Sequence, residues 1–295
     1  MQELSYFLGG AVMVEESHLL IAEDFSAVGQ LSMTAALPIM AAMAIPTASW
    51  PTSLLSTQTE GFGLPRHLET KTWIEQTQKH WQQVGLKLGG VLIGYFDQEE
   101  IVQQLWQQLG LPSLQLRVVD PVMADEGKFY PKITARHLQS LKRLCQRADV
   151  ITPNLTEASL LTGASYLACP DESALVKLLK NLSSLQPSNG KAVITGVVKN
   201  QQIGCCWLEE DQLKMAIYPC LPGHFYGSGD VFAALLTGFL WKKLSWSAAV
   251  QQAATLLYET LSQQVNQSPQ QRRFGIDLGY LLPRLLKTLM PTADN

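Results

Sequence analysis

The chain has 295 residues, enough for one large α/β domain or two small ones with a sizeable core. Its formal net charge of -3 and hydrophobic content of 46% are typical of a soluble globular protein and exclude the basic excess that nucleic-acid binding usually needs. No apolar run approaches the ~20 residues that cross a bilayer, so we expect neither a nucleic-acid nor a membrane partner.

The N-terminal stretch is apolar, but it contains Glu3 and has no Lys or Arg before its apolar run, which argues against a secretion signal. The five cysteines form an odd set without C-x-x-C spacing, which argues against a disulfide framework and a zinc site. We therefore expect a cytoplasmic protein. Because no repeat, long linker or low-complexity block interrupts the chain, we predict a single domain over 18–295 and an N-terminal extension of unknown role over 1–17.

Short apolar runs alternate with helical stretches along the chain. The predicted strands are 18–22, 114–120, 149–154 and 191–196, and the predicted helices are 31–43, 133–148, 172–185 and 230–241. This alternation predicts βαβ units, hence an α/β fold with a mostly parallel sheet covered by helices on both faces. Residues 45–63 break the rhythm: two prolines among β-prone, hydroxyl-rich residues predict irregular strands or a flap.

Polar residues follow three of the predicted strands. Asp120, the stretch 152–154 and the pair Thr195-Gly196 lie at the carboxyl ends of their strands. Open α/β sheets bind ligands beyond that edge, so we expect these residues to line a binding site.

A glycine-rich turn, Gly227-Ser228-Gly229-Asp230, precedes an apolar helix. Glycines permit positive φ and close approach, and the free amides of a helix N-terminus attract anions. Two roles are open for Asp230: it caps the helix, or it accepts a proton from a substrate hydroxyl while the amides hold a phosphoryl group. The chain contains neither a G-x-x-x-x-G-K-[ST] stretch nor a G-x-G-x-x-G after its first strand, so this turn is the expected phosphate site.

Six motifs in order resemble the pyridoxal kinase (vitamin B6 kinase) branch of the ribokinase-like superfamily, and most closely its bacterial pyridoxamine kinase type. They are "IAEDFSAVGQLS" (21–32), "PTSLLSTQT" (51–59), "GYF" (94–96), "DPVMADEGKFY" (120–130), "ITPNLTEASLLTG" (151–163) and "GSGDVFAALLTGF" (227–239). The resemblance covers roughly residues 18 to 280.

The resemblance implies a ribokinase-like three-layer α/β/α fold with a mostly parallel central sheet and a small flap. It also implies a transferase of vitamin B6 salvage that uses ATP to phosphorylate the 5′-hydroxymethyl group of pyridoxal, pyridoxine or pyridoxamine. Mg²⁺ is the implied cofactor, with a monovalent cation as a further candidate. The implied assembly is a homodimer, with the 45–63 flap near its interface.

In this family Asp230 would be the catalytic base, and Gly227, Ser228 and Gly229 would form the anion hole. Asp120, Asp125 and Glu157 match acidic positions near the nucleotide phosphates and the metal. Clustered carboxylates suit Mg²⁺ on physical grounds as well. The simpler alternatives are a strand-end turn for Asp120 and a first-turn helix carboxylate for Glu157.

The resemblance also assigns residues to the two substrates. The residues that match ATP-side positions are Asp120, Tyr130, Thr152, Asn154, Glu157 and Thr195. The residues that match the pyridine side are Asp24, Ser26, Thr59 and Tyr95, together with Asp230. A pyridine ring needs a few polar groups to fix its nitrogen and phenolic oxygen, and apolar walls for its faces. The alternatives are a polar loop at 24–26, satisfied turns at the strand-end hydroxyls, and ordinary packing of Tyr130.

Four departures from the family pattern stand out. Ala124 replaces a glycine and Ser228 a common threonine, which are small changes. Asp97 places a charge near the expected pocket wall, and Gln58 stands where many members have histidine; both leave the preferred vitamer open.

Two rival functions remain. Hydroxymethylpyrimidine kinases share the fold but commonly carry Gly-Thr-Gly-Cys where this chain has residues 227–230, so Asp230 favours the B6 interpretation. The second rival is a catalytically weak B6-binding carrier or sensor of the same fold, which Asp97, Gln58 and the extra N-terminal segment would suit.

Overall fold

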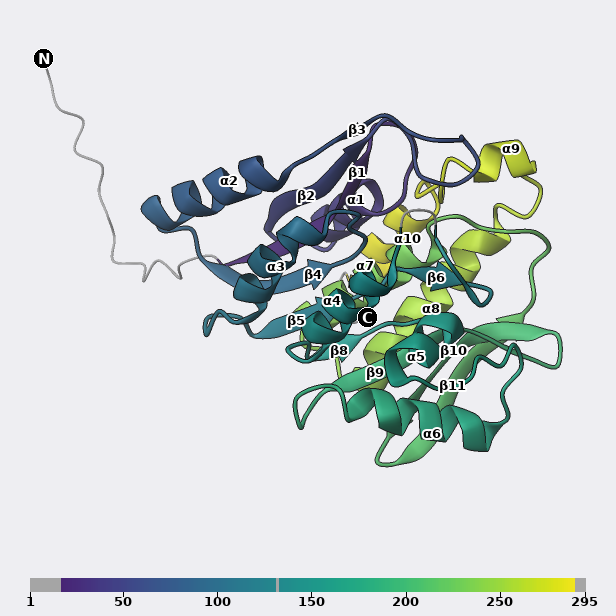
Figure 1. Cartoon of the computed structure of the whole chain (residues 1–295). Helices are drawn as coiled ribbons and strands as arrows, with labels where there is room; N and C mark the ends of the chain where they lie inside the picture. Colours follow the sequence, from purple (N-terminus) through teal and green to yellow (C-terminus); the bar gives the residue numbers. More distant parts are fainter. Residues whose placement is uncertain (1–16, 131–132, 290–295) are drawn as a thin grey trace, which may run out of the picture.

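The structure is a computed structural model that describes residues 17–130 and 133–289. The predicted N-terminal extension therefore lies outside the described residues, except for Ser17. A nine-stranded sheet forms the centre of the described part (Figure 1). Its strands are β1 (His18–Ser26), β2 (Thr47–Leu55), β3 (His67–Leu68), β4 (Leu88–Ile93), β5 (Leu116–Val119), β8 (Val150–Ile151), β9 (Lys191–Lys199), β10 (Gln202–Glu209) and β11 (Gln212–Pro219).

The strand order is β11-β10-β9-β8-β5-β4-β1-β2-β3. All pairs from β9 to β2 are parallel, whereas β10 and β11 at one edge and β3 at the other pair antiparallel. A separate hairpin joins β6 (Ala124–Asp125) to β7 (Lys128–Phe129). The mostly parallel sheet predicted from the sequence is thus confirmed.

Helices cover both faces of the sheet (Figure 1). One apolar layer includes α2 (Lys71–Gln83), α3 (Val102–Leu109), α4 (Ala135–Cys145), α5 (Leu155–Thr162) and α6 (Glu172–Ser183), and a short 3-10 turn, Glu99–Ile101, leads into α3. The opposite layer includes α1 (Met33–Ala42), α7 (Ser228–Trp241), α8 (Trp246–Ser262) and α10 (Leu281–Leu289), while α9 (Pro269–Arg272) is a single turn. This arrangement is the expected three-layer α/β/α fold.

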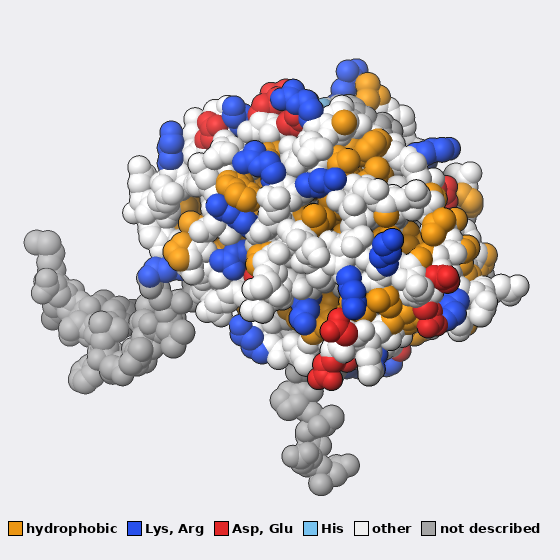
Figure 2. Space-filling view, turned by 60° about the horizontal axis from the view of Figure 1, so that its bottom comes forward, with side chains coloured by type: hydrophobic (Ala, Val, Ile, Leu, Met, Phe, Trp, Pro, Cys, Tyr) orange, Lys and Arg blue, Asp and Glu red, His pale blue; other side chains and the backbone are white. Residues whose placement is uncertain are grey.

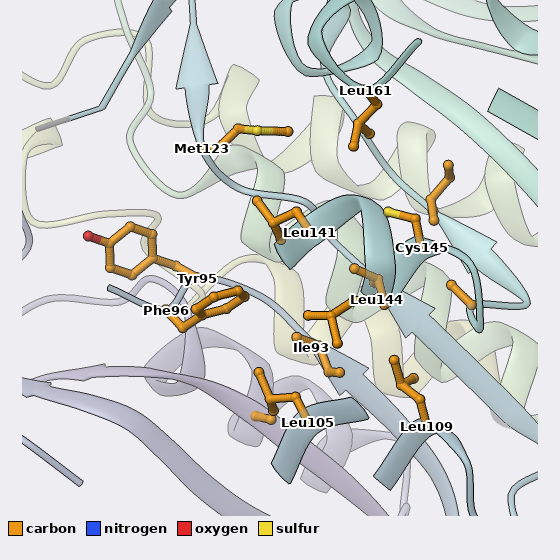
Figure 3. Packing of buried hydrophobic residues seen from close by; sticks show 14 of the residues in the cluster. Ile93, Tyr95, Phe96, Leu105, Leu109, Met123, Leu141, Leu144, Cys145 and Leu161 are labelled. Atoms are coloured by element: carbon orange, nitrogen blue, oxygen red, sulfur yellow. The ribbon is translucent and has the colours of Figure 1, made fainter. Parts of the chain in front are cut away.

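The central strands are buried on both faces because successive side chains point to opposite layers. In β1, Leu20 and Ala22 join one core and Leu19 and Ile21 the other. Figure 3 shows the first core, where Ile93 of β4 packs among leucines of α3 and α4.

The structure corrects one sequence expectation in the N-terminal half of the sheet and refines another. The first strand continues to Ser26, so Asp24 and Ser26 belong to β1 and not to a loop. Residues 47–55 form one strand parallel to β1, with Trp50 fully buried, but the pairing shifts register between Glu23 and Phe25, so the predicted irregularity is present within the strand as well as after Leu55. Proline has no N–H to donate to a neighbouring strand. Pro51 is accommodated in β2 because β3 pairs with β2 only at Leu54 and Leu55.

The sequence patterns did not predict β4, because its "LGGVLI" contains two glycines. They pack closely against α7: a Cβ at Gly90 would lie 2.8 Å from the Trp241 ring. A large side chain from the neighbouring layer fills the space that the glycines leave.

Within residues 17–130 and 133–289, no helix has both the length and the apolarity needed to cross a membrane. On the face shown in Figure 2, Lys and Arg side chains are dispersed, and acidic side chains lie among them in small groups.

The burial of Trp50 gives a test of this packing. We expect Trp50→Ala to lower the free energy of unfolding by about 3–5 kcal/mol, because the fully buried indole leaves a cavity against Trp81. The control is Trp73→Ala, at a side chain 48% exposed, which we expect to cost less than about 1 kcal/mol. Urea unfolding followed by circular dichroism measures both, and equal losses would contradict the assigned core.

Candidate active site

A cavity of about 690 Å³ lies at the carboxyl edge of the parallel strands. Its lining comes from strand ends, from the β6–β7 hairpin and from the N-terminus of α7. The predicted site residues that line it are Asp24, Thr59, Tyr95, Asp120, Asp125, Tyr130, Thr152, Asn154, Glu157, Thr195, Gly227, Ser228, Gly229 and Asp230. Ser26 does not line it, but its hydroxyl donates to Asp24 Oδ2 (3.3 Å). The structure thus brings together residues that are scattered over two thirds of the chain.

The glycine-rich turn sits at the start of α7. Gly227 has φ 81, and a Cβ there would lie 2.9 Å from the Leu31 side chain, so both backbone angle and space require glycine. The first amides of an α-helix have no acceptor within the helix. Because residues 227–229 line the cavity, these amides and the helix dipole form a site suited to an anion.

Asp230 is half-buried, and its carboxylate does not cap α7. Its Oδ2 instead accepts a hydrogen bond from the backbone N–H of Ser32 (2.8 Å) and a longer one from the Ser32 hydroxyl (3.4 Å). The capping role left open by the sequence is therefore wrong. Ser32 itself has φ 44, a left-handed value that is unusual for serine and typical of strained functional sites.

Burial raises the pKa of three carboxyl groups at this edge. It raises the pKa of Asp230 above its usual range, although the Ser32 donors oppose the shift. It raises the pKa of Asp24 to about 7, with the Ser26 and Ser32 hydroxyls opposing it. Burial and the charge of Asp230 raise the pKa of Asp120 to about 7, against the Thr152 hydroxyl, which donates to Asp120 Oδ1 (2.8 Å).

Glu157 and Asn154 form a capping box at the start of α5. Glu157 Oε2 accepts the Asn154 N–H (2.9 Å), and its Oε1 accepts the N–H groups of Met123 (2.9 Å) and Ala124 (3.4 Å). The Asn154 amide donates to the Ala124 carbonyl (2.7 Å). Burial and nearby Asp120 raise the pKa of Glu157 well above its usual range, against these donors. In this structure both residues position the segment after Asp120, which matches the simpler alternative for Glu157.

Among the described residues, no group of three or more His, Cys, Asp or Glu side chains lies close enough to hold a metal ion. Asp120 and Asp125 line the cavity without forming such a group. Mg²⁺ usually takes one or two carboxylates and completes its shell with phosphate oxygens and water. The donor set therefore fits a magnesium–nucleotide complex better than a resident metal ion.

Tyr95 and Asp24 belong to the same lining. The Tyr95 side chain is buried, and its hydroxyl has no hydrogen-bond partner in the described part of the chain. Figure 3 shows this hydroxyl pointing away from the apolar cluster. The Thr52 hydroxyl fixes the residue by donating to the Tyr95 carbonyl (2.6 Å). A buried hydroxyl without a partner is rare and suggests a ligand.

Two of the four departures from the family pattern, Asp97 and Gln58, have structural partners. Asp97 is absent from the cavity lining, and its carboxylate binds the Ser53 hydroxyl and lies 3.4 Å from His67 Nε2. Gln58 lines the cavity, and its side-chain amide donates to the Arg273 carbonyl, which ties the loop after β2 to the end of α9. The expected charge near the pocket wall is therefore present, because burial and then the charge of Asp97 raise the pKa of Tyr95, but Asp97 does not line the cavity itself.

Sequence reasoning missed the apolar part of the lining. It includes Ile203 and Tyr218 of the β10–β11 hairpin and Leu257 and Tyr258 of α8. The two tyrosine rings stack with centroids 4.6 Å apart. No short motif marks these positions, because each is one side chain of an ordinary strand or helix.

Sequence reasoning also missed Ser32 as a partner of Asp230, and its only signal is its place at the end of the motif 21–32. A third missed feature is the loop before Gly227, which the buried Arg272 holds by donating to the Pro222 carbonyl (2.6 Å) and by covering the Phe225 ring.

Comparison with known proteins places this site in context. A family model described as phosphomethylpyrimidine kinase matches residues 33–273. The crystal structure of pyridoxal kinase from Lactobacillus plantarum is 38% identical, with a TM-score of 0.87 over 92% of this chain and 97% of that chain. A Bacteroides thetaiotaomicron structure described as a phosphomethylpyrimidine kinase, in an orthorhombic form with pyridoxal, is 26% identical, with a TM-score of 0.83 over 94% of this chain and 98% of that one.

A curated pyridoxal kinase of Arabidopsis thaliana is 32% identical over 132 residues, which are 41% of this chain and 40% of that protein. The chain thus spans about two fifths of the length of this curated relative.

The raised pKa of Asp24 predicts a pH-dependent cost. Its pKa is about 7 in the folded chain against 3.8 for the free group, so the folded state binds the proton more tightly, and stability falls as pH rises between these values. Asp24→Asn removes this cost, so we expect the ligand-free variant to gain on the order of 2–4 kcal/mol above pH 7 and much less at pH 4.

Thermal unfolding at pH 4, 5.5 and 8 measures the gain. The control is Asp211→Asn, at a side chain 83% exposed, which should show no pH-dependent gain. A pH-independent difference between Asp24→Asn and the unmodified chain would contradict the assigned burial.

Proposed function

The chain belongs to the phosphomethylpyrimidine kinase family and lies on the pyridoxal kinase branch of the ribokinase-like superfamily, and from this membership we propose that it is an ATP-dependent B6-vitamer kinase. It would transfer the γ-phosphoryl group of ATP to the 5′-hydroxymethyl group of pyridoxal, pyridoxine or pyridoxamine. Such an activity would serve B6 salvage, and we assign it to one domain over 18–295.

One observation carries the proposal. The Asp230 carboxylate is held by the Ser32 N–H at 2.8 Å, beside the free amides of residues 227–229 in the same cavity. A structural cap would bond to its own helix, whereas this carboxylate lies where an alcohol would meet a bound phosphate. The raised pKa of Asp230 brings its basicity nearer to neutral pH, which suits general-base catalysis.

In the proposed reaction, the substrate 5′-oxygen forms a bond to the γ-phosphorus while the bond from that phosphorus to the β,γ-bridging oxygen breaks. The hydroxyl proton passes to Asp230, and ADP leaves with the bridging oxygen. Phosphoryl transfer needs positioning and charge stabilisation more than covalent help. The amides at 227–229 would stabilise the equatorial oxygens, and the Ser32 N–H would keep Asp230 aimed at the alcohol.

We also propose Mg²⁺ as the cofactor, held by Asp120 and Asp125 together with nucleotide oxygens. The ion would neutralise phosphate charge in a lining that, among the described residues, contains no lysine or arginine. Asn154 and Glu157 would act by holding the segment that carries these carboxylates.

Hydroxymethylpyrimidine phosphorylation is the weaker alternative, favoured by the description of the matching family model. Asp230 in the glycine turn favours the B6 substrate. The carrier or sensor alternative loses its support from Asp97 and Gln58, since both side chains have structural partners.

A homodimer and a cytoplasmic location complete the proposal. Exposed apolar side chains near the β3 edge, Leu64 and Leu68, support self-association, which light scattering would test.

All five cysteines are free, which suits a reducing compartment and therefore the proposed cytoplasmic location. Cell fractionation can test this location.

We predict that Asp230→Asn lowers kcat by about 10²–10⁴-fold with a small change in ATP affinity, because the amide cannot accept the proton. A coupled ADP-release assay with pyridoxal measures kcat, and calorimetry measures nucleotide binding.

The matched control is Ser32→Ala, which removes the 3.4 Å hydroxyl contact but keeps the 2.8 Å backbone bond, so its kcat should fall only a few-fold. Near-normal turnover of Asp230→Asn would overturn the assigned base.

A further inference from the structure

Glu23 is a second buried carboxyl group beside Asp24 at the end of β1. Its side chain is 1% exposed, and its Oε2 has no hydrogen-bond partner in the described part of the chain. Neither the motif comparison nor the proposed mechanism assigns it a role. Buried polar atoms are normally paired, so an unpaired carboxyl oxygen beneath an active site calls for an explanation.

The fold makes room for this carboxyl group. β1 and β4 are parallel neighbours, and Gly94 follows the last residue of β4. A Cβ at Gly94 would lie 2.9 Å from Glu23 Oε1, so any larger residue there would collide with the Glu23 side chain. The next residue is Tyr95, whose unpartnered hydroxyl belongs to the cavity wall. Glu23 thus lies beside Asp24 and next to the residue that precedes Tyr95, so it is adjacent to two residues of the cavity lining without lining the cavity itself.

The charges around Glu23 are all negative. Asp24 is its neighbour in β1, Asp120 follows β5, and Asp230 lies in the first turn of α7. In the described lining, His224 is the only side chain that can become positive. Burial, together with these carboxylates, raises the pKa of Glu23 well above its usual range. A positive charge bound nearby would relieve the repulsion.

We propose that Glu23 and Asp24 together select substrates that carry a positive charge, and that Glu23 is a specificity-determining residue. The inference rests on the proposed function. Pyridoxamine differs from pyridoxal and pyridoxine in carrying an aliphatic amine, which is protonated at neutral pH. The positive group would lie against Asp24 in the cavity lining, where its charge would offset the repulsion between Asp24 and the buried Glu23 carboxyl group and so favour their ionised forms. Pyridoxamine is therefore the preferred vitamer.

The test compares pyridoxamine with pyridoxine, an uncharged analogue at the same position. We expect the unmodified chain to have a KM for pyridoxamine at least about fivefold lower than for pyridoxine, a size typical of one partly screened charge contact. Glu23→Gln, a neutral isostere, should reduce that preference about fivefold through KM, with kcat changed less than about twofold. Glu23→Asp keeps the acid and should retain most of the preference.

Glu75→Gln, on the outer surface of α2, is the control and should leave the ratio unchanged. A Glu23→Gln variant that loses both vitamers equally would show a structural role and overturn the proposal. Equal KM values for the two vitamers in the unmodified chain would overturn it even if Glu23→Gln failed to fold. If no vitamer is phosphorylated at all, the proposed function fails first, and this inference fails with it.

Discussion

The hydrogen bond from the Ser32 backbone to Asp230 is the contact on which the site depends. It joins residues 198 positions apart and holds one carboxylate beside the free amides of α7. The bond exists because β1 and α7 meet at the carboxyl edge of the sheet, where α1 begins directly after Ser32. The positive φ of Ser32 is the local cost of aiming this amide, and the surrounding packing has to offset that cost.

A second constraint follows from the first. Several acids are buried at one sheet edge without a lysine or arginine in the described lining. In such a cavity, burial and mutual repulsion disfavour the ionised forms of the carboxyl groups. A bound cation relieves this, whether it is a metal ion that accompanies a nucleotide or a charged group of the alcohol substrate. The raised pKa values of Asp24 and Asp120, both to about 7, are the physical signature of this arrangement.

Much of this could be predicted from the sequence because the signals are local. Alternating apolar runs and amphipathic stretches predict the three layers, and polar residues at strand ends converge because parallel strands share an edge. The capping box of Asn154 and Glu157 is likewise a four-residue pattern. Other features have no local signal: the Asp230 partner, the burial of Glu23 and the pairing of Asp97 with Ser53 and His67 depend on which segments meet in space. The strand β4 was also missed, because its two glycines interrupt the apolar pattern. They are needed there because the Trp241 ring packs against them.

Direct phosphorylation of alcohols tests the central claim, that this acidic cavity brings an alcohol to a bound nucleotide. The purified chain would be incubated with ATP and Mg²⁺ and, separately, with pyridoxal, pyridoxine, pyridoxamine or hydroxymethylpyrimidine, and the products identified by mass spectrometry. The account predicts 5′-phosphates of the B6 vitamers, formed faster than hydroxymethylpyrimidine phosphate. Binding of nucleotide and vitamer without any transfer, or transfer to hydroxymethylpyrimidine alone, would contradict it.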